Sequence, residues 1–508
     1  MSDFMSELKK ATDSVQNNVS VTENGAIGYK MSEHALVDCN FKLSSMRNMD
    51  KNAIWGAFLP AYNENPTLAL LWLFFVRDCR EGCGERRTFR FIFELFCAEN
   101  EQAAIRLLPL IPFYGRWDDV VEVVFAEVPR KVRDEAILLL LKQVQSDILC
   151  ANTKQPVSLL AKWLPSLNTS SKESRRRAEF LRKAFGWAPG QYRRNLSGLR
   201  KRIRVVEQQM SANQWDKIDY ESVPSRAAMN YRRAFSRHDE ARYVEYLTNV
   251  KEGNAKINAG VLYPYDIVHA YNDGWSLLPP DATLEAQWKA LPDTVTDGCS
   301  TLVVVDGSGS MSCTVGNTGV TCHDVANSLG VYFAEKLPGA YNNAFITFSS
   351  RPQFIRFDPS LSLHGKLEVL YKHDDCSNTD IERTFDLILD VAVKNHLRQD
   401  EIPANILIVS DMEFDAATWG NDNQALFDVI RDKWDAAGYK LPRLVFWNVC
   451  SRTGTIPVTT NELGVALVSG FSPNIADMVL SGDLDPYTCL VEKLTSERYQ
   501  PVADALKE

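Results

Sequence analysis

The chain has 508 residues, of which 45% are hydrophobic and 24% charged, a composition typical of soluble globular proteins. At roughly 100–200 residues per domain, this length predicts two to four domains. A formal net charge of −9 excludes a protein that binds nucleic acid through overall positive charge. No basic segment followed by an apolar run marks a signal peptide at the N-terminus. The longest apolar run, Leu68 to Val76, has about half of the ~20 residues that a membrane helix needs.

Eleven cysteines are scattered along the chain, and Cys79 and Cys83 form the only close pair. No cysteines or histidines show the spacing of a zinc site. This usage indicates reduced thiols rather than a disulfide framework. We therefore expect a cytoplasmic protein without a membrane segment.

In chain order, residues 1–50 lack sustained periodicity and predict a partly ordered N-terminal arm. Residues 51–290 place apolar side chains at i, i+3 and i+4 spacing, which predicts a domain of amphipathic helices. Short turns with Pro, Gly or Asn separate these segments, so an α-solenoid of HEAT-like repeats is the expected architecture. The clearest predicted helices are Thr67–Arg77, Arg86–Cys97, Glu101–Leu110, Trp117–Phe125 and Asp134–Gln145.

The pattern changes near Leu291, where short β-branched runs begin to alternate with amphipathic helices. This alternation predicts a Rossmann-like α/β domain over 291–508 with a mainly parallel sheet covered on both faces. The predicted strands are Thr301–Val305, Ala344–Phe348, Gln353–Phe357, Ile406–Ser410, Arg443–Val449 and Val465–Ser469. The predicted helices between them are Asp324–Lys336, Ile381–Lys394 and Asn423–Ala437.

Three loops of this second domain carry hydroxyl and carboxylate groups at or beyond predicted strand ends: Val305–Met311, Ser377–Asp380 and Val409–Glu413. Ligands of open α/β sheets bind beyond the carboxyl ends of the strands. Mg²⁺ prefers oxygen ligands at ~2.0–2.1 Å and keeps several waters, and the glycines of the first loop permit the tight turn that such ligands require. The sequence therefore predicts a divalent-cation site formed by these three loops.

The Asp-x-Ser-x-Ser spacing, a distant Thr before a helix and an Asp after another strand resemble the metal-ion-dependent adhesion site of von Willebrand factor A domains. The resemblance implies that Ser308, Ser310 and Thr379 hold the cation through hydroxyls, while Asp306 and Asp411 act mostly through water. The expected cation is Mg²⁺, or another divalent ion such as Mn²⁺ or Ca²⁺. A carboxylate or phosphate oxygen of a partner would complete its coordination.

Two alternatives accompany this interpretation. The glycine-rich loop is also compatible with a merely flexible turn, although five matching positions on three strand ends favour the site. An insertion from Ser312 to His323, with Cys313 and Cys322, precedes the next predicted helix. It is expected either to cover the site or to contact a partner, and a disulfide between its cysteines is disfavoured in a reducing compartment.

A basic stretch lies within the acidic chain, since residues 170–245 contain 18 Lys and Arg against 9 Asp and Glu. Basic side chains neutralise phosphates, and aromatic rings stack on unpaired bases. A solvated helix face explains such a stretch equally well. The aromatic residues interleaved with it are Phe185, Trp187, Tyr192, Trp215, Tyr220, Tyr231 and Phe235.

Four further segments, Arg77 to Arg87, Tyr114 to Asp119, Lys162 to Ser166 and Tyr192 to Leu196, resemble a branch of the proteins that join a Ro/TROVE-like helical-repeat domain to a von Willebrand A domain. The resemblance extends over about 30–500. It implies a helical ring closed by the A domain, which binds single-stranded RNA ends or small structured non-coding RNA. The implied RNA contacts are Lys172, Arg175, Arg176, Arg193, Arg194, Arg200, Arg202 and Arg204.

The Arg77 to Arg87 turn has a structural interpretation that we favour, in which Arg80, Glu85 and Arg86 pair across a corner between helices. Trp117 to Asp119 similarly indicates a helix start with acidic residues in its first turn.

The chain contains no P-loop, dinucleotide-binding turn or HExxH motif, and no Ser/His/Asp set is evident. Glu413 and Asp415 could form a second acidic site, yet two-metal catalysis relies on carboxylates that bridge ions ~3.5–4 Å apart, and this site is rich in hydroxyls. The leading hypothesis is a non-enzymatic RNA-binding protein for RNA quality control or a ribonucleoprotein. The alternative is an adaptor that binds the carboxylate of a protein partner through the metal.

Overall fold

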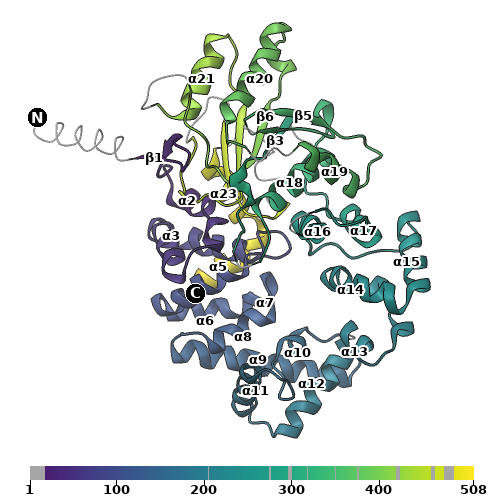
Figure 1. Ribbon diagram of the computed structural model, residues 1–508. Coiled ribbons are helices and arrows are strands. Elements are labelled where there is room, and N and C mark those ends of the chain that lie inside the picture. Colours follow the sequence, from purple (N-terminus) through teal and green to yellow (C-terminus); the bar gives the residue numbers. More distant parts are fainter. Residues whose placement is uncertain are drawn as a thin grey trace, which may run out of the picture. The chain divides into compact units, whose positions relative to one another are not determined.

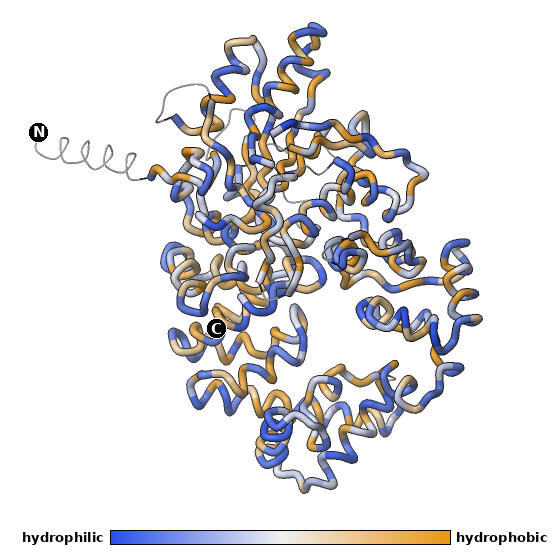
Figure 2. Tube along the Cα trace, in the orientation of Figure 1, coloured by the Kyte–Doolittle hydropathy of each residue, from blue (hydrophilic) through white to orange (hydrophobic). Residues whose placement is uncertain are grey.

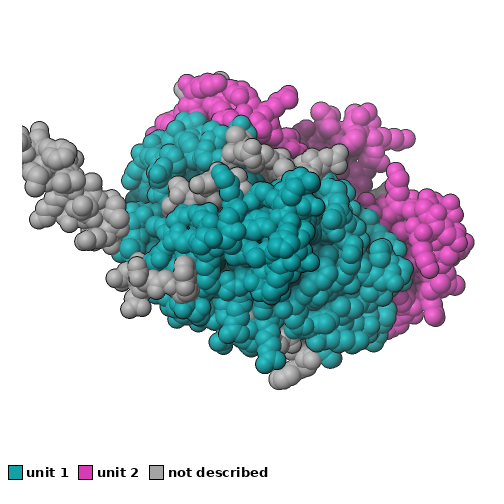
Figure 3. Space-filling model, turned by 90° about the horizontal axis from the view of Figure 1, so that it is seen from above, with its two compact units in different colours: residues 1–68, 262–494 teal, residues 69–261, 495–508 magenta. Residues whose placement is uncertain are grey.

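A computed structural model describes the chain in the ranges 18–203, 205–273, 276–295, 300–316, 318–348, 350–373, 377–418, 424–458, 464–473 and 485–507. The chain forms two compact units (Figure 3). Unit 1 comprises 1–68 and 262–494, and unit 2 comprises 69–261 and 495–508. These bounds differ from the predicted domains 1–50, 51–290 and 291–508, because segments distant in sequence pack together within each unit.

Unit 1 contains a six-stranded sheet in the order β5-β4-β3-β6-β7-β8. Its strands β3, β5 and β6 are labelled in Figure 1. All neighbouring strands are parallel except β5, which is antiparallel to β4 at one edge. A helical N-terminal region followed by a mostly parallel α/β sheet is therefore confirmed. The strands are β3 (Thr301–Asp306), β4 (Ala344–Phe348), β5 (Gln353–Arg356), β6 (Asn405–Ser410), β7 (Arg443–Asn448) and β8 (Val465–Ser469).

Helices cover both faces of this sheet, as its uniformly apolar strands predict. Because side chains alternate along a strand, Leu302 and Val304 pack in one core cluster with α20 (Ile381–Lys394) and α21 (Leu426–Ala436). Val305 points to the opposite face, where a Cβ added at Gly330 of α18 (Cys322–Lys336) would lie 2.6 Å from its Cγ2. The remaining helical elements among these strands are η5 (Gly309–Ser312), η6 (Gly339–Tyr341), α19 (Leu363–His373), η7 (Gln399–Glu401) and α23 (Pro486–Leu494).

The predicted strands and helices of this part agree closely with the structure. The bounds of β4, β8 and α20 are as predicted, and the other strands differ by one residue at an end. The predicted helix Asn423–Ala437 begins in the structure at Leu426, and Asn423 lies outside the described residues.

Residues 18–50, which were expected to be a partly ordered arm, instead form part of unit 1. A hairpin of β1 (Val19–Val21) and β2 (Ile27–Tyr29) pairs with the far end of the chain, because Tyr29 and Ile456 exchange two backbone hydrogen bonds of 2.8 Å. Phe41, in α2 (Ala35–Phe41), is fully buried in the core beside β8. The next elements are η1 (Ser45–Arg47) and α3 (Lys51–Glu64).

Residues 262–290, which were predicted to end the helical domain, also belong to unit 1. They form α16 (Pro264–Tyr271) and α17 (Ala282–Lys289). His269 Nδ1 lies 2.8 Å from the carboxylate of Asp324 on α18, and Trp288 donates to Glu335 at 2.9 Å. These polar contacts to α18 help to hold α16 and α17 in unit 1.

All regular elements that the structure describes in unit 2 are helices, and its segment with α11 is predominantly hydrophilic (Figure 2). The five predicted helices are present, with α8 at the predicted bounds. The elements, beginning with α4 at the unit boundary, are α4 (Pro66–Arg77), α5 (Arg86–Glu99), α6 (Glu101–Leu107), η2 (Leu108–Leu110), α7 (Ile111–Tyr114), α8 (Trp117–Phe125), α9 (Arg130–Asn152), α10 (Leu160–Trp163), α11 (Lys172–Ala184), α12 (Pro189–Ile203), α13 (Val206–Ser211), η3 (Trp215–Lys217), η4 (Tyr220–Ser222), α14 (Ser225–His238), α15 (Glu240–Glu252), η9 (Glu497–Tyr499) and α24 (Gln500–Lys507).

A buried ion pair connects two of the sequence motifs in unit 2. Arg77, 2% exposed, places Nη2 2.6 Å from Asp119 Oδ2, and the same oxygen accepts a bond from the backbone of Arg116. This contact makes Asp119 a cap of α8, so the helix start predicted at Trp117 is confirmed. Two members of the predicted Arg80, Glu85 and Arg86 set also make contacts at this corner. Arg80 donates to Phe113 O at 2.6 Å, and Arg86 lies 3.7 Å from Asp118 Oδ2.

No helix among the described residues combines the length and apolar character needed to cross a membrane.

Candidate metal centre

The candidate centre lies at the switch point of the strand order, between the central strands β3 and β6. From β3 the chain proceeds outward through β4 to β5, and from β6 it proceeds the other way through β7 to β8. The crevice beyond the carboxyl ends of the two central strands is the usual ligand position of such sheets. Asp306 is the last residue of β3, and Asp411 follows the last residue of β6.

The loop after β3 turns its polar groups towards one point. Asp306 Oδ1 accepts a hydrogen bond from the backbone N of Ser308 at 2.9 Å, and the hydroxyls of Ser308 and Ser310 lie 3.0 Å apart. Across the sheet, Ser410 Oγ donates to Asp306 Oδ2 at 2.5 Å. The predicted Asp306, Ser308 and Ser310 set is thus held together by local bonds and by β6.

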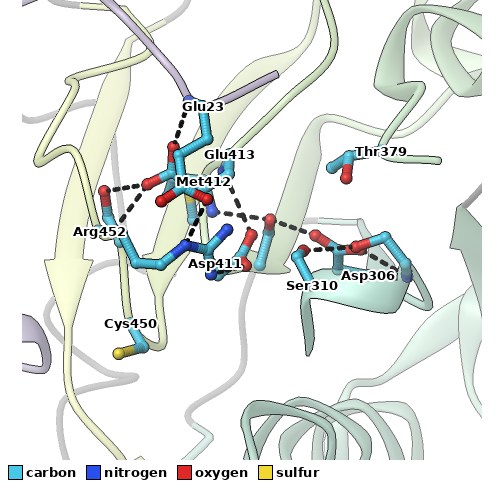
Figure 4. A network of polar contacts seen from close by, with 12 residues as sticks. Glu23, Asp306, Ser310, Thr379, Asp411, Met412, Glu413, Cys450 and Arg452 are labelled. Carbon is cyan, nitrogen blue, oxygen red and sulfur yellow. Dashed lines mark hydrogen bonds and ion pairs between the residues drawn. The ribbon is translucent and has the colours of Figure 1, made fainter. Parts of the chain in front are cut away.

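Thr379 belongs to the same rim through its neighbours. Gly309 N donates to Ser377 O at 3.0 Å, which joins the first loop to the second. Asp415 N donates to Thr379 O at 3.0 Å, which joins the second loop to the third. Thr379 is 1% exposed and lies on the Asp306 side of the network in Figure 4. The structure therefore brings together the three loops that carry the five predicted ligands.

The two carboxylates of the centre are fully buried, at 0% exposure each. Burial, and then the negative charge of Asp411, raise the pKa of Asp306 to about 7. Burial likewise raises the pKa of Asp411, although Arg452 opposes this effect. Two buried acids that repel each other are stabilised either by protonation of one of them or by a nearby positive charge.

The donor set fits a hard divalent cation such as Mg²⁺. The described residues contain no group of three or more His, Cys, Asp or Glu side chains suited to a metal. This centre instead combines two carboxylates with hydroxyls, all of them hard oxygen donors. Asp306, Ser308, Ser310, Thr379 and Asp411 are the residues that would hold the cation.

Arg452 is a component of the centre that the sequence did not indicate. Its Nη1 donates to Asp411 Oδ2 at 2.9 Å, and its Nε donates to Glu23 Oε2 at 2.6 Å. Burial opposes the charge of this guanidinium, but Asp411 and Glu23 raise its pKa above the ordinary value. Arg452 therefore remains a cation in contact with a predicted metal-binding acid.

Glu413 has a structural role that excludes it from a second metal site. Its fully buried carboxylate accepts hydrogen bonds from the backbone N atoms of Glu23, Arg452 and Thr453 and from the hydroxyls of Ser451 and Thr453. These donors occupy both carboxylate oxygens. A two-metal acidic site at this position is therefore not supported.

The tip of the N-terminal hairpin is the second unexpected component. Asn24 Nδ2 donates to Glu413 O at 2.7 Å and lies 3.3 Å from Thr379 Oγ1. Thr22 Oγ1 donates to Phe414 O at 2.6 Å. Residues near position 23 thus form one wall of a centre whose predicted ligands lie between 306 and 411.

The insertion after the centre packs within unit 1. Thr314 and Thr321 form an antiparallel bridge, and Gly316 N donates to Asn48 Oδ1 at 2.6 Å. Cys313 and Cys322 are free thiols, so no disulfide closes the insertion.

The basic residues predicted to contact RNA fall into distinct groups. Lys172, Arg175, Arg176, Arg193, Arg194 and Arg202 are exposed, although Arg176 also pairs with Glu173 at 3.1 Å. Arg200 is used within the fold, because its three guanidinium nitrogens donate to Ala161 O, Ser166 Oγ and Leu164 O. Arg204 lies outside the described residues.

Five of the seven aromatic residues that interleave with this basic stretch are core residues. Phe185, Trp187, Tyr192, Tyr220 and Phe235 are at most 8% exposed. Tyr220 and Phe235 belong to an apolar cluster that the partly buried Trp215 and Tyr231 pack against. The five buried rings therefore stabilise the helices of unit 2, and Trp215 and Tyr231 contribute to the same packing.

Two parts of the chain match protein families, and nearly the whole chain is similar to one viral protein. Residues 300–500 match a family described as a domain of unknown function (DUF7788), and residues 171–300 match another so described (DUF2828). The chain is 28% identical over 521 residues to "Uncharacterized protein L728" of Acanthamoeba polyphaga mimivirus, covering 96% of this chain and 89% of that protein. None of these descriptions names a ligand, so the von Willebrand A and Ro resemblances stay predictions. The first match starts one residue before β3.

Glu23 and Arg452, which the sequence did not indicate, have no local sequence pattern that marks them as part of the centre. Glu23 and Arg452 are separated by 429 positions, and each resembles an ordinary surface residue in its own segment. Their pairing depends on the strand-like contact of Tyr29 with Ile456. The sequence of a short hairpin without strong periodicity does not predict such a contact.

Proposed function

We propose that unit 1 is a von Willebrand A-like, non-enzymatic binding domain that takes one divalent cation and recognises an acidic group of a ligand through it. The observation that carries this proposal is the meeting of buried Asp306 and Asp411 at the switch point of the sheet, with the Ser308 and Ser310 hydroxyls beside them. The strand order and the single antiparallel edge strand also support it.

Binding of Mn²⁺, followed by electron paramagnetic resonance and calorimetry, tests this function. We expect one ion per chain in the wild type and a loss of at least about tenfold in affinity for the double variant Ser308→Ala/Ser310→Ala. Ser312→Ala, an exposed hydroxyl of the same loop, is the matched control and should bind as the wild type does. A wild-type chain that binds no Mn²⁺ contradicts the proposal.

A second candidate function is RNA binding by unit 2, with HEAT-like repeats as its scaffold. It is favoured by one face of α12, where Arg193, Arg194 and Lys201 are exposed on a helix that contains no acidic residue. Its buried face carries Tyr192, Leu196 and Leu199, so the basic residues are not needed for packing. Such a face suits phosphate groups.

Anisotropy of a labelled single-stranded RNA distinguishes this candidate. Arg193→Glu/Arg194→Glu should weaken the binding strongly and make it less dependent on salt, because each lost phosphate contact removes affinity that comes from counterion release. Arg130→Glu, with a 92% exposed side chain on α9, is the control for charge reversal elsewhere in unit 2. RNA binding that is absent from the wild type, or unchanged in the double variant, rejects this role of α12.

A further inference from the structure

Arg452 connects the surface of unit 1 with a buried acid. Its side chain is 26% exposed, between the fully buried Asp411 and Glu23, which is 49% exposed. The backbone N of Arg452 is anchored on Glu413 at 2.7 Å, so the position of the residue does not depend on Glu23. Figure 4 shows the guanidinium extending to Asp411 from the Glu23 side.

One edge of this guanidinium is only half used. Nη1 donates a hydrogen bond to Asp411 and Nε donates one to Glu23, while Nη2 has no partner among the residues that the structure describes. Nε and Nη2 point to the same side of a guanidinium and together match the two oxygens of a carboxylate. Glu23 therefore occupies, through one oxygen, an edge that could hold a carboxylate by both.

Glu23 is suited to leave this edge. Exposed ion pairs contribute only about 0–1 kcal/mol, and the carboxylate of Glu23 is half-exposed although the guanidinium of Arg452 is 26% exposed. The backbone N of Glu23 stays bound to Glu413 Oε2 at 2.9 Å whichever way the side chain points. The carboxylate of Glu23 can thus move into solvent without displacing the hairpin.

We infer that Arg452 is the ligand-recognition residue of the candidate centre, and that Glu23 is an internal carboxylate which an incoming carboxylate replaces. This inference rests on the proposed cation-binding function and names its ligand class as the carboxylate of an acidic partner. The ligand is held both by the cation and by Arg452, whose contact with Asp411 places the two next to each other. Glu23 and Arg452 thereby set the ligand selectivity of the centre, whereas the three loops provide the residues for the cation.

The test uses the full chain saturated with Mn²⁺ and acetate as the probe, with binding read from water-proton relaxation. At saturating Mn²⁺, Arg452→Lys, which keeps the charge and loses the planar edge, should bind acetate about tenfold more weakly than the wild type does. Glu23→Gln should bind acetate roughly 3–10-fold more tightly, because the competing carboxylate is gone. Arg398→Lys, an exposed arginine paired with Asp400, is the matched control.

The outcomes separate this inference from the function on which it rests. Acetate binding unchanged in both Arg452→Lys and Glu23→Gln overturns the role of Arg452, even when Mn²⁺ binds. Tighter binding of inorganic phosphate than of acetate overturns the carboxylate class. A wild type without Mn²⁺ binding removes the proposed function itself. Glu23→Gln alters a half-exposed side chain, so its result does not depend on the folding of an Arg452 variant.

Discussion

Arg200 donates its Nε hydrogen to the carbonyl oxygen of Ala161 at 2.8 Å, from α12 to α10. Its other two nitrogens bind Leu164 O and Ser166 Oγ at 2.7 Å each. Burial lowers the pKa of this guanidinium, yet its hydrogen bonds to backbone carbonyls hold the loop after α10 against α12. A residue that resembles a nucleic-acid contact is thus a support of the fold.

We therefore expect Arg200→Met to destabilise unit 2 by roughly 1.5–3 kcal/mol, because several hydrogen bonds to a charged group are lost. Arg193→Met, exposed on the same helix, should change stability by less than about 0.5 kcal/mol. Urea unfolding of both variants measures the difference. Equal unfolding midpoints would show that the contacts of Arg200 are not stabilising.

The buried ion pair of Arg77 and Asp119 predicts a larger effect. Removing one partner leaves an uncompensated buried charge, so Arg77→Met should cost about 3–5 kcal/mol. Arg130→Met, which breaks an exposed pair with Asp134 at 3.5 Å, should cost less than about 0.5 kcal/mol. Thermal unfolding provides the comparison, and a small loss for Arg77→Met would mean that Arg90 alone, 2.7 Å from Asp119, neutralises the acid.

The sheet of unit 1 could be predicted from sequence because its signals are local. Strands such as Ala344–Phe348 are mainly apolar and β-branched or aromatic, and each is followed by an amphipathic helix or a turn. Strand type and a parallel arrangement therefore follow from the pattern alone. The three loops of the centre follow from the same logic, since carboxyl ends of parallel strands share one rim.

The rest of unit 1 depends on contacts that no local pattern encodes. The hairpin of β1 and β2 has strands of three residues, too short for a recognisable alternation, and it acquires its place through Ile456. Arg452 and Glu23 consequently escaped prediction. The same limit affected the basic stretch, where a count of arginines could not distinguish the internal Arg200 from the exposed Arg193.

The pair of His269 and Asp324 predicts a dependence of stability on pH. The hydrogen bond with Asp324 raises the pKa of His269, while burial opposes it. Burial favours the neutral form of Asp324, but its bonds with His269, Thr321 and Asn272 lower its pKa overall. The stabilisation of the fold by this pair is fully present below the ordinary imidazole pKa of 6.5. It is lost as pH rises through the raised pKa of His269. On the acid side it is lost as pH falls through the lowered pKa of Asp324.

His269→Gln should therefore lower the unfolding temperature most between about pH 4 and pH 6.5, and least in mildly alkaline buffer. The imidazole is 38% exposed, so the effect should stay below about 1 kcal/mol. Calorimetry of the wild type and the variant across this range provides the measurement. A difference in stability that does not change with pH would show that the pair acts only as a neutral hydrogen bond.

Two glycines near the N-terminus predict opposite responses to the same substitution. Gly28 lies so close to the chain near Ile456 that an added Cβ would meet the carbonyl oxygen of Ile456 at 2.6 Å. Gly56, on an exposed turn of α3, would meet nothing within 4 Å. Gly28→Ala should thus force the hairpin outward and cost about 1–3 kcal/mol, whereas Gly56→Ala should add about 0.5–1 kcal/mol through helix propensity.

The same pair tests whether the hairpin belongs to the centre. Outward movement of β2 would withdraw Asn24 from Thr379 and Glu23 from Arg452, so Gly28→Ala should also weaken Mn²⁺ binding in the folded chain. Gly56→Ala should leave Mn²⁺ affinity unchanged, since α3 provides none of the residues described in the centre. Titration of both variants with Mn²⁺ well below their unfolding temperatures decides the point. Wild-type affinity in Gly28→Ala would mean that the centre keeps its geometry without the wall formed by the hairpin.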